Sequence, residues 1–132
     1  MSKPDADIHI TLDDQKNLSK FNQLHTQRKA VREELREKRD LARDLEEASN
    51  EMLLADEDKP IYYAFGSGFA ALPLETATQL IEVSAELATK RVDELADKNT
   101  ELTSTLSTLR SEIYARLGQS VNLDEDEDDN DE

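Results

Sequence analysis

Apolar residues recur at helical spacing along the first third of the chain. No Gly or Pro occurs from Thr11 to Met52, and a heptad frame over this stretch defines ten seam positions. Most positions between them are charged. Seven of the ten seam positions are apolar: Phe21, Leu24, Val31, Leu35, Ala42, Leu45 and Met52. This spacing predicts a helix over residues 11–56 that carries a coiled-coil stripe.

The predicted start of this helix has a capping signal. The side chain of Thr11 can accept a hydrogen bond from a free backbone amide, and Asp14 stands three residues later, as in a capping box. The first ten residues have no such pattern and are expected to be a flexible lead.

A second heptad pattern follows and is more regular. Pro73 favours a helix start and Gly118 a helix stop, which predicts a helix over residues 73–117. Six seam positions recur at intervals of seven, at Leu74, Ile81, Ala88, Leu95, Leu102 and Leu109. Asn99 is the one amide in the second row of seam positions. It is either a tolerated polar residue or a residue that sets the register of helix pairing.

The interval between the two patterns predicts a β-hairpin over residues 61–72. Its bulky residues are typical of strands, and Gly66 and Gly68 suit a tight turn. Two strands alone are marginally stable in water, so we expect the hairpin to pair with other subunits. The alternative is that it folds back onto its own helices. The residues predicted to mediate assembly are Ile61, Tyr62, Tyr63, Phe65, Gly66, Gly68, Phe69 and Leu72.

These elements together predict a mainly α fold. Two long helices would form an antiparallel coiled coil, with a single β-hairpin at the base that joins a β-barrel shared between subunits. The length of 132 residues allows one domain, which we place at residues 11–123.

Composition narrows the range of partners and compartments. The net charge of -15 argues against nucleic acid and against anionic membrane surfaces. No run of residues is long and apolar enough for a membrane span, and no signal peptide is evident, so we expect a cytoplasmic protein, with some nuclear protein possible. Residues 124–132 hold 8 of the 31 acidic residues and are expected to be disordered. This tail is either solubilising or a docking segment for a basic partner.

The chain offers little material for catalysis. It has no cysteine, and its histidines, His9 and His25, lack ligand-spaced partners. The glycines of residues 66–68 do not match a phosphate-binding loop. We therefore predict no catalytic residue, no metal site and no cofactor, and the protein is not expected to be an enzyme.

Apolar residues also continue to the ends of the predicted coiled coil, away from the hairpin. They are either ordinary seam residues or an incompletely buried tip that binds apolar segments of other proteins. The tip candidates are Leu12, Leu18, Phe21, Ile113, Leu117, Val121 and Leu123.

Three segments of the chain have a distinctive sequence: "ITLDDQKNLSKFNQL" from Ile10, "LEEASNEMLLADED" from Leu45 and "LRSEIYARLGQSVNLDEDED" from Leu109. In this order they resemble β-type subunits of the prefoldin family. The resemblance covers nearly the whole chain from about residue 8. The turn at residues 66–68 departs from the more usual single glycine followed by an acid.

This resemblance implies a heterohexamer of α-type and β-type prefoldin subunits with a double β-barrel platform. Its coiled-coil arms would hold unfolded actin and tubulin without ATP and pass them to the cytosolic chaperonin. The hairpin would then be the assembly segment, and the tip residues would contact clients. Two alternatives are a coiled-coil scaffold or tether without holding activity, and an RNA-docking arm, which the acidic balance disfavours.

Overall fold

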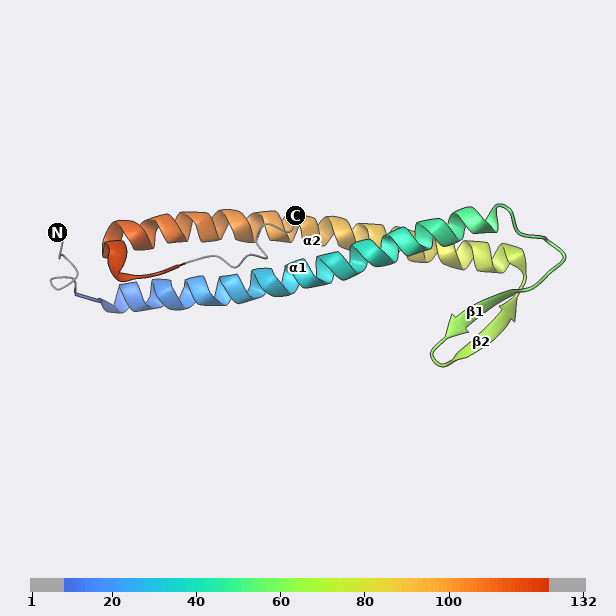
Figure 1. Ribbon diagram of the computed structural model, residues 1–132, viewed down its shortest axis with the longest axis horizontal. Helices are drawn as coiled ribbons and strands as arrows, with labels where there is room; N and C mark the ends of the chain where they lie inside the picture. Colours follow the sequence, from blue (N-terminus) through green and yellow to red (C-terminus); the bar gives the residue numbers. More distant parts are fainter. Residues whose placement is uncertain (1–8, 124–132) are drawn as a thin grey trace. The chain divides into compact units, whose positions relative to one another are not determined.

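The computed structural model describes residues 9–123, apart from the side chain of Gln119 (Figure 1). Most of the predicted N-terminal lead and all of the predicted acidic tail lie outside these described residues. The chain divides into two compact units. Of the described residues, unit 1 comprises 9–30 and 99–123, and unit 2 comprises 31–98.

The first long helix, α1, spans Leu12–Met52. The predicted capping box is confirmed, because the Thr11 hydroxyl accepts from the Asp14 amide at 3.0 Å and Asp14 Oδ2 accepts from the Thr11 amide at 3.0 Å. Thr11 is therefore the residue before the helix and not its first residue.

The predicted end of this helix at residue 56 is wrong, because α1 ends at Met52. The next residues form short turns, in which the amide of Leu53 bonds the carbonyl of Asn50 and that of Leu54 bonds the carbonyl of Glu51. The carboxylate of Asp56 then accepts from the amide of Asp58 at 2.9 Å. This local side-chain bond offers the backbone a turn in place of another helical turn.

The hairpin matches its predicted bounds. Strand β1 (Ile61–Phe65) pairs antiparallel with β2 (Gly68–Leu72), and the register joins Ile61 to Leu72 and Phe65 to Gly68. Gly66 has a φ of 53°, and no non-glycine residue in the described chain has a positive φ. A positive φ at the first of two loop residues is the pattern of a type II′ turn, which follows the twist of the strands.

The second long helix, α2, spans Leu74–Leu117. It begins one residue after the predicted start, because Pro73 precedes the helix and its carbonyl accepts the amide of Ala77 at 3.0 Å. The predicted stop is confirmed at Gly118, whose φ of 60° suits glycine and ends the helix. A short 3-10 helix, η2 (Gly118–Ser120), follows.

The predicted seam supplies most of the apolar core of both units. None of the ten α1 positions or twelve α2 positions of the heptad frames is exposed. In unit 2 the most deeply buried are Leu35, Ala77, Ile81, Ala88 and Leu95. In unit 1 the core gathers Phe21, Leu106, Leu109, Ile113, Leu117 and Leu123. No helix within the described residues is long and apolar enough to cross a membrane.

Candidate functional site

The β-hairpin of unit 2 has two faces, because side chains alternate along each strand. The register assigns Ile61, Tyr63, Phe65, Ala70 and Leu72 to one face, here called the inner face. It assigns Tyr62, Ala64, Phe69 and Ala71 to the other, here called the outer face. All the assembly residues predicted from the sequence lie in this hairpin, but they are divided between its two faces and its turn.

The side chains of the outer face are exposed to solvent. Tyr62 is 70% exposed and Phe69 is 74% exposed, and the two alanines beside them are also exposed. Within the described residues the sheet has only two strands, so each strand also has one edge without a β-partner. An exposed aromatic face with unpaired edges is a surface that readily adds further strands.

The inner face is partly covered by the helices of unit 2. The half-buried Tyr63 lines a groove of about 450 Å³ together with Leu41 and Leu45 of α1 and Leu87 of α2. The ring of Tyr63 lies 5.1 Å from that of Phe65. Tyr63 therefore faces the helices of unit 2 across this groove, in the direction that folding back onto them would require. The outer face does not face these helices.

Unit 2 also exposes apolar side chains that the sequence analysis did not single out. Leu80, Val83 and Leu87 recur at helical spacing on α2, outside the heptad seam, and are 37%, 55% and 63% exposed. Leu53 and Leu54, just after α1, are 80% and 91% exposed. The spacing of the α2 residues was visible in the sequence as a second stripe, whereas the exposure of the two leucines depends on where α1 ends.

The tip residues predicted from the sequence lie in unit 1, and most of them are covered. Four belong to its buried core, with exposed fractions from 1% to 7%: Phe21, Ile113, Leu117 and Leu123. Leu18 and Val121 are partly buried against that core. Leu12 is 66% exposed and has Ile10, at 47%, as its exposed apolar neighbour. The interpretation of these residues as ordinary seam residues therefore describes most of them in the free chain.

Polar contacts join the start of α1 to the end of α2 in unit 1. The buried carboxylate of Asp14 lies 3.2 Å from the guanidinium of Arg116. The same guanidinium donates a hydrogen bond to the backbone carbonyl of His9 at 3.1 Å. Asp14 thus serves both the capping box and the pairing of the helices, and the second role has no local sequence signal.

The seam of unit 1 contains buried polar residues. Asn99 is 6% exposed, and Arg28 at 2% donates a hydrogen bond from Nη1 to the Thr103 hydroxyl at 3.4 Å. Buried polar residues in a coiled-coil seam favour one register over others, since a shifted register leaves them without suitable partners. The register role of Asn99 stays a prediction.

In unit 2 an ion pair joins the two helices. Arg91 donates from Nε and Nη2 to the two carboxylate oxygens of Glu34, each at 3.0 Å, and from Nη1 to Glu94 at 3.3 Å. The hydrogen bonds from Arg91 hold the pKa of Glu34 below its ordinary value of 4.5. The same bonds raise the pKa of Arg91.

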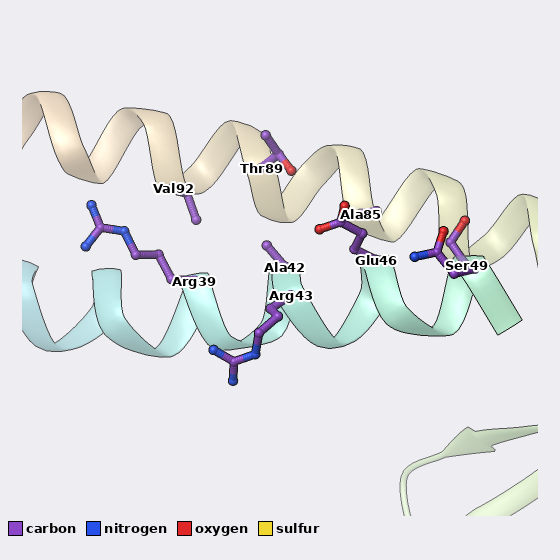
Figure 2. Close-up of a pocket in the computed structure, with 9 residues that line it drawn as sticks. Arg39, Ala42, Arg43, Glu46, Ser49, Ala85, Thr89 and Val92 are labelled. Atoms are coloured by element: carbon purple, nitrogen blue, oxygen red, sulfur yellow. The ribbon is translucent and has the colours of Figure 1, made fainter.

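A groove of about 560 Å³ lies along the helices of unit 2, where the seam residues are small (Figure 2). Ala42 and Ala85 lie along it, and its titratable lining residues are Arg39, Arg43 and Glu46. Arg43 points away from α2 in Figure 2 and pairs with Asp40 at 3.1 Å. Across residues 9–123, no three His, Asp or Glu side chains gather into a group that could hold a metal ion.

The chain is similar to known proteins over most of its length. A family profile described as prefoldin subunit matches residues 15–120. Prefoldin subunit 4 of Saccharomyces cerevisiae is 30% identical over 115 residues, which cover 87% of this chain and 89% of that protein. Prefoldin subunit 4 of Homo sapiens is 27% identical over 122 residues, covering 92% and 91% of the two chains.

The fold also has a counterpart among solved structures. The crystal structure of the prefoldin beta subunit from Thermococcus strain KS-1 superposes with a TM-score of 0.70 and covers 83% of this chain and 96% of that chain. Sequence identity over this match is 17%, so the likeness concerns the fold. Both chains consist of two long helices with a β-hairpin between them.

Proposed function

The chain belongs to the prefoldin subunit family, and on that premise we propose that it acts as a β-type subunit of a heterohexameric prefoldin that holds unfolded proteins. Prefoldin subunits are chaperone subunits that form hetero-oligomers with one another. The finer parts of the proposal concern which surface joins the subunits, which surface meets clients and where those clients go.

The outer face of the hairpin carries the proposal for assembly. Aromatic side chains removed from water at an interface supply much of its binding energy. Strands of α-type and β-type partners, added to the free edges of β1 and β2, would cover Tyr62 and Phe69 and extend the sheet into a barrel. The exposed stripe of Leu80, Val83 and Leu87 lies in the same unit and gives the partners further apolar surface to bury.

Client binding is proposed for unit 1. Its core is apolar, and Ile10 and Leu12 are exposed beside the start of α1. Several such ends in one hexamer would hold a client through many weak contacts, which together bind far more tightly than any single one. Such holding needs no nucleotide, because it uses the apolar surface that unfolded chains expose.

We further propose unfolded actin and tubulin as clients and the cytosolic chaperonin as the receiver, in agreement with the family resemblance. A cytoplasmic location is part of the same proposal. A coiled-coil scaffold or tether would share the fold and the assembly surface but would not hold unfolded chains. Holding activity therefore separates the two functions.

The test is to co-express the chain with α-type and β-type prefoldin partners, purify the complex and dilute chemically denatured actin into it. We expect light scattering from aggregating actin to fall in proportion to the complex added, with no requirement for ATP. The same amount of a folded coiled-coil protein serves as the control. A complex that assembles but leaves actin aggregation unchanged would identify the chain as a scaffold.

A further inference from the structure

The chain turns back on itself after α2. Gly118, with its positive φ, ends the helix, and the hydroxyl of Ser120 donates to the carbonyl of Leu117. From Val121, with φ -122° and ψ 154°, the backbone is extended. Figure 1 shows this segment leaving the end of α2 and running back beside the helices of unit 1.

Residues 121–123, here called the return segment, are held by unit 1 like a bound peptide. Leu123 is 7% exposed and belongs to the same buried cluster as Phe21 of α1 and Leu106 of α2. Val121 packs against that cluster, while Asn122 between them is exposed. The amide of Leu123 donates a hydrogen bond to the phenol oxygen of Tyr114 at 3.0 Å.

This arrangement has the features of extended-peptide recognition. Alternate side chains of an extended segment point to the same side, so Val121 and Leu123 enter the apolar surface and Asn122 faces solvent. One backbone hydrogen bond, from Leu123 to Tyr114, helps to fix the position of the peptide. None of these contacts is specific to a tethered segment, so a separate peptide with the same spacing could make them.

We propose that unit 1 contains a binding groove for extended apolar peptides, formed by α1 and α2, and that the return segment is its resident occupant. The ligand is an extended stretch with large aliphatic side chains at positions i and i+2. A client segment of this kind displaces Val121 and Leu123 and takes their place beside Phe21 and Leu106. The inference rests on the proposed holding function and names both the ligand class and the occupant that competes with it.

The competition has a calculable size. The short tether holds the return segment at an effective concentration on the order of 1 mM. If a free peptide binds the groove with a Kd on the order of 0.1 mM, this concentration is about ten times the Kd. The return segment then fills the groove in about ten of every eleven molecules. Removing the resident side chain should therefore strengthen binding of an external peptide about tenfold. The resident would also shield the apolar groove from solvent while no client is bound.

The test uses the assembled hetero-oligomer and a peptide with the sequence of residues 118–123, labelled at its N-terminus with a photoreactive group. Crosslinking is measured against peptide concentration, and mass spectrometry identifies the labelled subunit, which separates this chain from its neighbours. We expect Leu123→Ser to lower the apparent Kd about tenfold. Asn122→Ser changes an exposed side chain of the same segment and should behave as the unaltered chain does.

A second pair of variants distinguishes loss of the resident side chain from a folding defect caused by Leu123→Ser. A chain ending after Ser120 lacks the return segment and should gain peptide binding, whereas a chain ending after Leu123 keeps it and should not. A peptide with serine in place of its leucine should bind none of these complexes. Equal crosslinking with and without the return segment, weaker crosslinking without it, or equal capture of the serine peptide would each overturn the proposal.

The peptide crosslinking experiment tests the groove, and the actin assay tests the holding function, so either hypothesis can be rejected without the other. If the complex suppresses actin aggregation but peptide binding ignores Leu123, the groove is wrong and the holding function stands. If peptide binding follows the prediction but no complex holds actin, the groove exists and the holding function is wrong.

Discussion

Two oxygens of Glu34 on α1 accept two hydrogen bonds from Arg91 on α2, and this bidentate contact joins the two helices in unit 2. Both side chains are substantially exposed, so salt and water weaken their attraction. The effect of this ion pair on stability depends on pH in the acid range. Since the folded pKa of Glu34 is lowered, the stabilisation is present above the pKa of the unfolded carboxyl and is lost as the pH falls through the folded pKa.

At this scale we predict that Arg91→Met raises the pKa of Glu34 toward its ordinary value of 4.5, because the group that favours its charged form is removed. An NMR titration of the Glu34 side-chain carboxyl measures the change. Arg43→Met is the matched control, since Arg43 pairs with Asp40 on its own helix and should leave Glu34 unaffected. An unchanged pKa of Glu34 in the Arg91 variant would show that the bidentate contact does not form in solution.

At the scale of elements, the helices derive their stability from the seam and not from their exposed faces. Leu117 is 1% exposed at the end of α2, while Leu12, also predicted as a tip residue, is 66% exposed at the start of α1. Replacing a buried leucine by alanine leaves a cavity as well as less apolar burial, whereas at an exposed position neither cost applies.

We therefore expect Leu117→Ala to lower the free energy of unfolding by about 2–5 kcal/mol. Leu12→Ala should change it by less than about 0.5 kcal/mol. Urea unfolding followed by circular dichroism at 222 nm provides both values. Similar losses for the two variants would contradict the burial of Leu117.

The elements most predictable from the sequence are those with local signals. Thr11 and Asp14 mark the start of α1, Gly118 marks the end of α2, and Gly66 with strand-forming neighbours marks the hairpin. The end of α1 at Met52 differs from the predicted end because residues 53–55 form short turns through backbone hydrogen bonds. These bonds leave no local residue signal in the sequence.

The candidate sites were only partly predictable for a different reason. Alternation in residues 61–72 defines two hairpin faces, but which face meets the helices depends on the packing of Tyr63 in unit 2. In unit 1 the sequence left Val121 and Leu123 as either ordinary seam residues or part of an incompletely buried tip. Their burial requires the chain to reverse at Gly118 and reach a surface built from both helices, and no local pattern specifies that surface.

At the scale of the whole molecule, nine of the eleven exposed large apolar side chains among residues 9–123 lie in unit 2, and the other two, Ile10 and Leu12, lie in unit 1. Under the proposed function, this division places assembly and client contact in different parts of the chain. The two functions should therefore respond to different substitutions.

We predict that the double substitution Tyr62→Ser and Phe69→Ser prevents incorporation into the hetero-oligomer. An aromatic residue at the centre of an interface typically contributes about 2 kcal/mol or more, so affinity should fall roughly a hundredfold or more. Co-purification with a tagged α-type partner and size-exclusion chromatography measure the loss. Ile10→Ser with Leu12→Ser removes two exposed apolar residues of unit 1 and should leave assembly intact.

The bare outer face has a further consequence for how the protein is supplied in the cell. A subunit made in excess of its partners keeps Tyr62 and Phe69 in water, next to unpaired strand edges. To proteases and other chaperones it presents the same apolar surface as a misfolded chain. Orphan copies should then be degraded or aggregate, and the amount of complex would follow the scarcest subunit. The face that we propose for assembly would thus also mark every unassembled copy for removal.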